Sequence, residues 1–225
     1  MVEIASTTVN AGDFVKLDYS GKTSDGKEFD STRGRKPVLV VAGKNQLVKG
    51  LDAAIIGAEK GVKKSVDVPR DKAFGERNPE LVRLIPTQKF AEQGIKPVPG
   101  MAFEIDGVLA RVQSVSGGRV RVDFNHELAG LDLHYDFTVT EIFKKPEEKI
   151  SALFEDALGA FGVKAEDVSF KEGVARVNAG EKVVKNSDFI ARKLRAIAFA
   201  LEFVPELKKI VFEEEYARLE KTEFK

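Results

Sequence analysis

Apolar and polar side chains alternate along several short stretches near the start of the chain, which predicts strands. In residues 13–19 the odd positions after Asp13 are apolar or aromatic, whereas Lys16 and Asp18 follow Phe14 on the other face. This two-residue period is typical of a half-buried strand. An Asp25-Gly26 pair then favours a tight hairpin turn. Residues 38–41 form a continuous apolar run that suits a central strand, and residues 63–69 alternate again.

Residues 43–51 predict a turn that leads into a short helix. Gly43 can adopt the positive φ that ends the preceding strand, and Gly50 is small enough for another element to pass close. Leu47, Val48 and Leu51 then share one side of a helical turn. We expect the first ~70 residues to form a curved antiparallel sheet with this helix against it, as the floor of a pocket.

A second pattern occupies residues 81–124, where four further strands and a short helix capped by Thr87 are expected. A module of ~50 residues has too little core to bury all of its apolar side chains. Some of them are therefore expected to stay exposed and form a groove for unfolded chains; the alternative is that they only fill a small core. These residues are Leu81, Leu84, Ile85, Phe90, Ile95, Val98 and Met101.

The remaining pattern predicts one more strand at residues 131–142 and then a separate α+β region. Pro146 begins a helix that runs to residue 161, and Ser187 caps a second helix that runs to residue 203. The second helix is apolar on two sides. One stripe comprises Ile190, Leu194, Ile197 and Leu201, and the other apolar side chains are Phe189, Ala196, Phe199, Ala200 and Phe203. Either the helix is fully buried, or one face packs locally and the other mediates self-association.

Composition narrows the class of protein. The 36 Lys and Arg residues equal the 36 Asp and Glu residues, which argues against nucleic acid or an anionic membrane as the main partner. There is no cysteine, so disulfides and thiolate chemistry are excluded. No apolar run approaches the ~18 residues of a membrane span, and we expect a cytoplasmic protein. His126 and His134 are interpreted as structural, with no metal site expected.

Four short motifs follow one another along the chain: Tyr19-Ser20-Gly21, residues 25–32, residues 43–51 and Ala73-Phe74-Gly75. Their order and spacing resemble the signature of FKBP-type peptidyl-prolyl isomerases. The chain also resembles the SlyD-like branch, in which an inserted domain replaces the flap and the first domain resumes at a motif matched by residues 125–130. The part beyond residue 145 is similar to the extra domain of long archaeal forms.

The resemblance implies an α+β fold in three parts. Residues 1–75 and 126–144 would form the isomerase domain with its FKBP-like curved antiparallel sheet and short helix. Residues 76–125 would form a small β-rich insert-in-flap chaperone domain. Residues 145–225 would form a C-terminal α+β domain, interpreted as a self-association module and thus a route to a homodimer.

The resemblance also assigns a proline pocket. Its catalytic residues would be Tyr19, Asp30, Phe74 and Tyr135. Substrate-binding residues would be Phe29, Val38, Val40, Leu47, Val48 and Leu51 in the first domain, with Leu84, Ile85, Phe90 and Met101 in the insert. Val48 would offer a backbone N–H to the peptide. Leu51 replaces the Trp common in single-domain forms, which predicts a wider pocket.

Isomerisation of an X-Pro bond is slow because amide resonance must be broken, with a barrier near ~20 kcal/mol. A cavity that favours the twisted, less polar amide lowers this barrier without a nucleophile or cofactor. We therefore expect a peptidyl-prolyl cis-trans isomerase with chaperone activity that acts on unfolded or proline-containing polypeptides. The alternative is a non-catalytic FKBP-like chaperone or assembly adaptor; retained Tyr19, Asp30 and Phe74 favour the enzyme.

Overall fold

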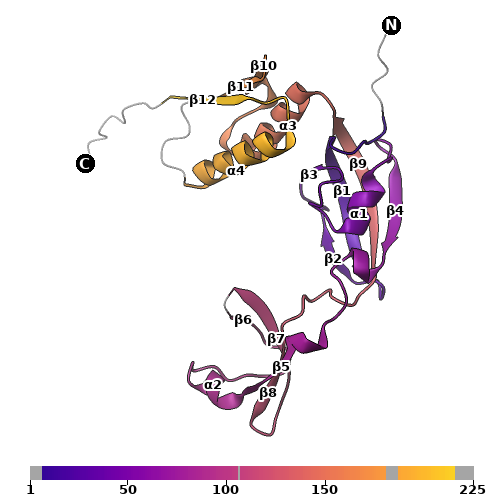
Figure 1. Cartoon of the computed structure of the whole chain (residues 1–225), viewed down its shortest axis with the longest axis vertical. Helices are drawn as coiled ribbons and strands as arrows, with labels where there is room; N and C mark the ends of the chain where they lie inside the picture. The colour runs from indigo at the N-terminus through magenta and orange to yellow at the C-terminus, as the bar shows by residue number, and fades with distance from the viewer. Residues whose placement is uncertain (1–6, 106, 181–186, 216–225) are drawn as a thin grey trace, which may run out of the picture.

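The computed structural model describes residues 7–105, 107–180 and 187–215 (Figure 1). This part of the chain is α+β, with three separate sheets and helices of different lengths. In the view of Figure 1 the first sheet lies between the other two, which occupy opposite ends of the molecule. Within the described residues, no helix is both long and apolar enough to cross a membrane.

The first sheet has five strands, and β9 pairs with strands far from it in sequence. Its strands are β1 (Phe14–Thr23), β2 (Glu28–Ser31), β3 (Val38–Val41), β4 (Lys63–Val68) and β9 (Leu133–Phe143). The order is β2-β1-β9-β4, with β3 also paired to β1, and every pairing is antiparallel. The strand predicted at residues 131–142 therefore lies inside this sheet, between β1 and β4. Its inward side chains Tyr135, Phe137 and Val139 are buried as the alternation predicts.

Helix α1 (Lys49–Ile55) begins later than predicted. Val48 is its N-cap with extended backbone, so Leu47 and Val48 precede the helix and the prediction that they lie on a helical turn was wrong. The turn before it is held by the buried Asp52 carboxylate, which accepts hydrogen bonds from the Gly43 and Asn45 N–H groups at 3.0 and 2.8 Å. Because these contacts fix residues 43–45 as a turn, the helix starts only after them.

The two glycines of this segment behave as expected. Gly43 adopts a φ of 76°, and at Gly50 the side chain of Val68 from β4 occupies the space where a Cβ would stand. Strand β4 therefore packs directly on the helix backbone.

The second sheet contains β5 (Val82–Pro86), β6 (Ala102–Ile105), β7 (Val108–Ser116) and β8 (Arg119–Asp123), in the order β5-β8-β7-β6. Helix α2 (Thr87–Ala91) follows β5, but Pro86 is its N-cap and no side chain caps it. The Thr87 hydroxyl instead donates to the Gly118 carbonyl at 3.0 Å, so the predicted Thr87 cap was wrong. The core here is small: Phe90, Ala110, Val112, Val120 and Val122 are its buried residues.

The third sheet belongs to the C-terminal part. Helix α3 (Pro146–Leu158) ends three residues earlier than predicted and continues as a 3₁₀ turn, Gly159–Phe161. Strands β10 (Val168–Lys171) and β11 (Val174–Gly180) form a hairpin, and β12 (Lys209–Glu214) pairs parallel to β11. Helix α4 (Ser187–Phe203) begins at the residue expected to cap it; residue 186, which would precede it, lies outside the described residues.

Helix α4 buries one face and exposes another. Phe189, Ala196 and Ala200 are buried in the core shared with α3. The stripe that includes Ile190, Leu194 and Leu201 is 49%, 58% and 52% exposed. The alternative of a fully buried helix is therefore wrong.

The C-terminal core continues into the first sheet through Phe14. Although its neighbours in the pattern, Lys16 and Asp18, are polar, Phe14 is fully buried and its ring meets that of Phe199 edge to face at 5.7 Å between centroids. Phe14 and Val41 belong to the same hydrophobic cluster as helices α3 and α4. The outer face of β1 is thus covered at one end and half-buried further along.

Candidate active site

Strands β1, β2 and β9, helix α1 and the segment after β4 contribute side chains to one cavity of about 320 Å³. Eight of the residues predicted to form the proline pocket line it: Tyr19, Phe29, Asp30, Leu47, Val48, Leu51, Phe74 and Tyr135. These residues span more than a hundred positions of sequence, and the pairing of β1 with β9 brings Tyr19 and Tyr135 together. The structure thus gathers the predicted residues around one space large enough for a small ring.

Gly21 allows the aromatic rings to approach the sheet. A Cβ at this position would lie 2.6 Å from the Phe29 ring and 2.7 Å from the Tyr135 ring. These two rings meet edge to face, with centroids 5.8 Å apart, an arrangement favoured by the ring quadrupoles. Any larger residue at position 21 would push the cavity wall outward.

Asp30 is the carboxylate of the cavity, and it has two donors. The Tyr19 hydroxyl donates to Asp30 Oδ2 at 2.5 Å, and the Arg35 guanidinium pairs with Oδ1 at 2.9 Å. The Tyr19 hydrogen bond, then Arg35, hold the pKa of Asp30 below its ordinary value, although partial burial opposes them. The carboxylate is therefore ionised at neutral pH. Arg35 was not among the predicted residues, although it follows Asp30 closely in a loop rich in basic residues.

Tyr135 presents a free hydroxyl to the cavity. Among the described residues, no group hydrogen-bonds to this hydroxyl. Burial, and secondarily the Asp30 charge, raise the pKa of Tyr135 to about 12, so the phenol keeps its proton. Burial also raises the pKa of Tyr19, with the Asp30 hydrogen bond as the next cause. The site therefore holds one negative charge and one available hydroxyl donor.

His126 and Leu128 also line the cavity, and sequence reasoning did not place them there. The His126 ring stacks on Phe74 with centroids 4.1 Å apart and planes 3° from parallel. Its Nδ1 accepts a hydrogen bond from the Leu128 N–H at 3.1 Å, which fixes the ring over the turn. Their membership in the motif at residues 125–130 was the available signal, because this motif returns the chain to the pocket rim.

Val38 and Val40 do not line this cavity, contrary to their predicted role. Val40 is 6% exposed and packs in the core beneath the sheet, and Val38 packs against the same cluster. Both belong to β3, which pairs with β1 at residues 14–17, away from Tyr19. Their contribution is to the core.

Four residues within residues 76–125 were predicted to bind substrate; three of them line a cavity and the fourth packs against a core. A second cavity of about 760 Å³ is lined by Leu84, Ile85 and Phe90 together with other residues of this part. Leu84 is 61% exposed, whereas Phe90 is 4% exposed and forms a floor. Met101 packs against the core but does not line the cavity, contrary to its predicted role. The expectation of exposed apolar side chains is met by Leu84 and by Val98, which is 50% exposed.

An aromatic cavity whose carboxylate is already held by Tyr19 and Arg35, with one phenol available as a donor, suits a reaction that breaks no covalent bond. Residues 83–128 match the family described as FKBP26, IF domain. The chain is 32% identical over 148 residues to the short-type peptidyl-prolyl cis-trans isomerase of Methanocaldococcus jannaschii, covering 60% of this chain and 94% of that protein.

Two bacterial relatives agree. The FKBP-type 16 kDa peptidyl-prolyl cis-trans isomerase of Escherichia coli (strain K12) is 30% identical over 145 residues, or 61% of this chain and 95% of that protein. The FKBP-type isomerase SlyD of Haemophilus influenzae is 32% identical over 142 residues, or 61% of this chain and 74% of that protein. The chain belongs to the FKBP-type peptidyl-prolyl cis-trans isomerases, in their SlyD-like branch. It is an enzyme of this type, acting on proline-containing polypeptides.

Proposed function

We propose that the chain accelerates X-Pro isomerisation in unfolded or nascent proteins that residues 76–125 capture as a chaperone-like domain. Residues 1–75 and 126–144 would then form the FKBP-like isomerase domain, and residues 145–225 a C-terminal α+β domain. The observation that carries the proposal is the open apolar cavity bordered by Leu84, on the same chain as the aromatic cavity. Such a cavity suits transient binding of exposed apolar segments.

In the aromatic cavity, we assign the proline ring to the space between Phe29, Phe74 and Tyr135. The Tyr135 hydroxyl and the Val48 N–H, which has no hydrogen-bond acceptor within the described part of the chain, would hold the flanking peptide groups. Asp30 would act through its field on the rotating amide rather than as a proton carrier, because its carboxylate is already held by Tyr19 and Arg35. Catalysis then comes from better binding of the twisted amide than of the planar one.

The capture step has a physical reason. A proline pocket contacts few residues of a client, whereas an unfolded client offers many scattered apolar segments. A second binding site on the same chain raises the local concentration of prolines at the pocket by effective molarity.

Replacing residues 77–124 by a short Gly/Ser linker tests this division of labour. Isomerisation of a proline tetrapeptide should stay within about threefold of the parent, whereas catalysis of a proline-limited refolding protein should fall at least ~10-fold. Equal loss on both substrates would show that this region shapes the aromatic cavity. Unchanged catalysis on the protein would contradict capture by this region.

We also propose that α4 mediates self-association. Ile190, Leu194, Ile197 and Leu201 follow one another at spacings of four, three and four residues, as along the seam of paired helices. Three of them are about half exposed. A second copy of the same helix offers a matching apolar surface.

A further inference from the structure

Three cavities of the described chain share walls. A cleft of about 970 Å³ is lined by residues of the β1–β2 hairpin, of residues 107–109 and of residues 124–131. It shares Val108 and Phe124 with the cavity bordered by Leu84. It shares Phe29, His126 and Leu128 with the aromatic cavity. The cleft therefore connects the two sites already described.

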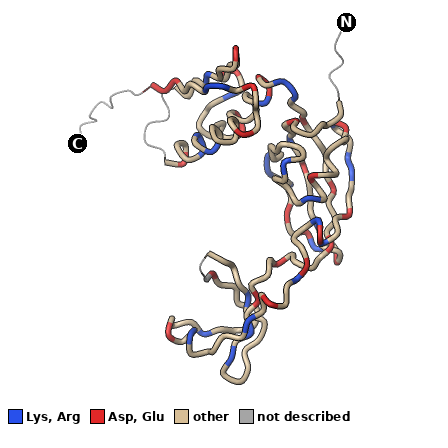
Figure 2. The backbone as a smooth tube through the Cα atoms, viewed as in Figure 1, with Lys and Arg blue, Asp and Glu red and all other residues tan. Residues whose placement is uncertain are grey.

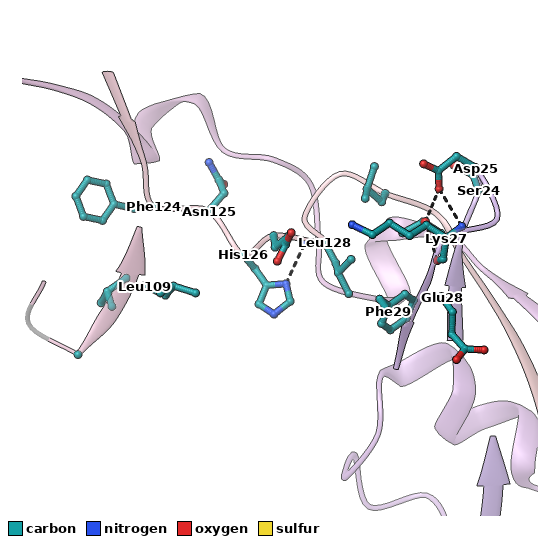
Figure 3. A pocket seen from close by; sticks show the side chains of 15 residues that line it. Ser24, Asp25, Lys27, Glu28, Phe29, Leu109, Phe124, Asn125, His126 and Leu128 are labelled. Atoms are coloured by element: carbon teal, nitrogen blue, oxygen red, sulfur yellow. Dashed lines mark hydrogen bonds between the residues drawn. The ribbon is translucent and has the colours of Figure 1, made fainter. Parts of the chain in front are cut away.

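Exposed apolar side chains face this cleft from both sides. Figure 3 shows Leu109 and Phe124 on one side, Lys27 and Phe29 on the other, and His126 with Leu128 between them. Leu109 is 64% exposed and Leu131 is 37% exposed. Both line the cleft, and neither lines the aromatic cavity or the cavity bordered by Leu84. Leu109 and Leu131 are therefore exposed apolar side chains of the cleft that belong to neither flanking cavity.

The two chain segments that join the parts are tied to each other. The Asn78 N–H donates to Asn125 Oδ1 at 2.8 Å, and Asn125 Nδ2 donates back to the Asn78 carbonyl at 3.0 Å. Beside them, the Arg77 guanidinium pairs with the buried Asp123 carboxylate. Gly130 N–H donates to the Gly75 carbonyl at 2.8 Å, closer to the first sheet. These hydrogen bonds and this ion pair restrict the motion of one connecting segment relative to the other. The shape of the cleft beside them is therefore expected to persist.

We propose that this cleft binds an extended segment of the client polypeptide, so that one continuous stretch of client contacts the Leu84 cavity, the cleft and the aromatic cavity. The inference rests on the proposed function and deepens it, because it joins the capture site and the aromatic cavity into one continuous binding surface. We call this surface the track. An extended polypeptide is the occupant that can follow a path through three adjoining cavities. Three acidic residues and one basic residue line the cleft: Asp25, Glu28, Glu127 and Lys27. This acidic excess disfavours a polyanion, and the apolar side chains of the cleft suit a polypeptide.

Peptides of equal length test the track. A proline tetrapeptide is extended by a spacer and an apolar anchor of Leu and Phe, with the spacer either Gly/Ser or alternating Val/Ser. If the cleft contacts the spacer, the KM of the Val/Ser peptide should be about fivefold lower than that of the Gly/Ser peptide. A difference of this size corresponds to partial burial of two or three side chains. Leu109→Ser and Leu131→Ser should each remove most of this difference. Val115→Ser and Val62→Ser are matched controls, because these side chains are 38% and 43% exposed and lie outside the three cavities.

Equal KM values for both spacers on the parent, or an unchanged difference in both leucine variants, would overturn the track. Binding of an unfolded, proline-free polypeptide to the parent and to the chain with residues 77–124 replaced separates this failure from that of the proposed function. If such a polypeptide still binds the parent and no longer binds the chain with residues 77–124 replaced, capture stands and only the continuous path is refuted.

Discussion

Asp30 shows how the surroundings of one residue limit its chemical role. Its two oxygens are occupied by Tyr19 and Arg35, and both donors favour the ionised form. A carboxylate held in this way is a poor proton carrier but a fixed charge beside the amide. Asp30→Ala should therefore lower kcat/KM for a proline tetrapeptide by about 3- to 10-fold, roughly 0.7–1.4 kcal/mol of transition-state stabilisation.

A protease-coupled or refolding assay measures this change, and Asp71→Ala, at an exposed acidic position beyond β4, is the control. Complete loss of activity in a folded Asp30→Ala variant would indicate obligatory acid-base chemistry instead.

Phe74→Ala should reduce activity by a similar factor, because it removes a wall of the cavity and the ring on which His126 stacks.

The lowered pKa of Asp30 also predicts a pH dependence of stability. A carboxylate whose pKa is lower in the folded state stabilises the fold fully above the unfolded value of about 3.9. This contribution is lost as the pH falls through the lower folded value. The urea midpoint of the parent should thus exceed that of Asp30→Asn by a constant amount from about pH 5 to 8, and the difference should shrink below about pH 4. A difference that instead grows in acid would contradict the assigned hydrogen bonds.

Helix α1 depends on the close packing of the Val68 side chain against Gly50. The sequence indicates this packing only through the small size of glycine. An Ala in a helix interior is ordinarily more stable than Gly by about 1 kcal/mol. At Gly50, however, an added methyl would overlap the branched side chain of Val68, which is itself buried. Overpacking of this kind costs about 1–3 kcal/mol. The overpacking cost exceeds the helix preference for Ala by about 1 kcal/mol, so Gly50→Ala should destabilise the protein by about that amount in urea denaturation.

Lys49→Ala is the control for Gly50→Ala, since Lys49 lies on the exposed side of the same helix. It should leave the free energy of unfolding within about 0.5 kcal/mol of the parent. A Gly50→Ala variant as stable as Lys49→Ala would mean that β4 moves away from the helix at little energetic cost.

Local pattern predicted most elements here, and the failures have a common cause. The run at residues 38–41 and the alternation in β9 specify strands by themselves. The start of α1 depends instead on Asp52 bonding back to Gly43 and Asn45. The hydroxyl of Thr87 bonds to Gly118 across a hairpin. Contacts of this kind depend on how distant segments meet, which periodicity does not report.

The aromatic cavity shows the same distinction between what local pattern predicts and what contacts between distant segments decide. The ordered motifs were sufficient to predict eight residues of the aromatic cavity, because their spacing reflects the arrangement of strands within one sheet. His126 was missed because its contact with Phe74 depends on where the chain re-enters after residues 76–125. Phe14 was assigned to a polar face because the helix that covers it lies far along the chain.

At the scale of the whole molecule, the C-terminal part uses only some of its apolar surface to join the first sheet. Phe14, Val41 and the inner face of α4 share one core. The stripe containing Leu194 points elsewhere and remains about half exposed. An exposed apolar stripe of this kind is typical of a surface that contacts another protein.

A second copy of α4 is the proposed cover, and Leu194→Glu tests it. In a symmetric pair each substitution acts twice and places two like charges in an apolar contact, so the dissociation constant should rise about 100-fold or more. Sedimentation velocity over a range of concentrations should show dimers for the parent and monomers for the variant. Arg195→Glu places a Glu at an exposed position further round the same helix, and should leave the dimer intact. A parent that stays monomeric at every concentration would refute self-association. Equal dissociation constants for the parent and Leu194→Glu would place the contact on another surface.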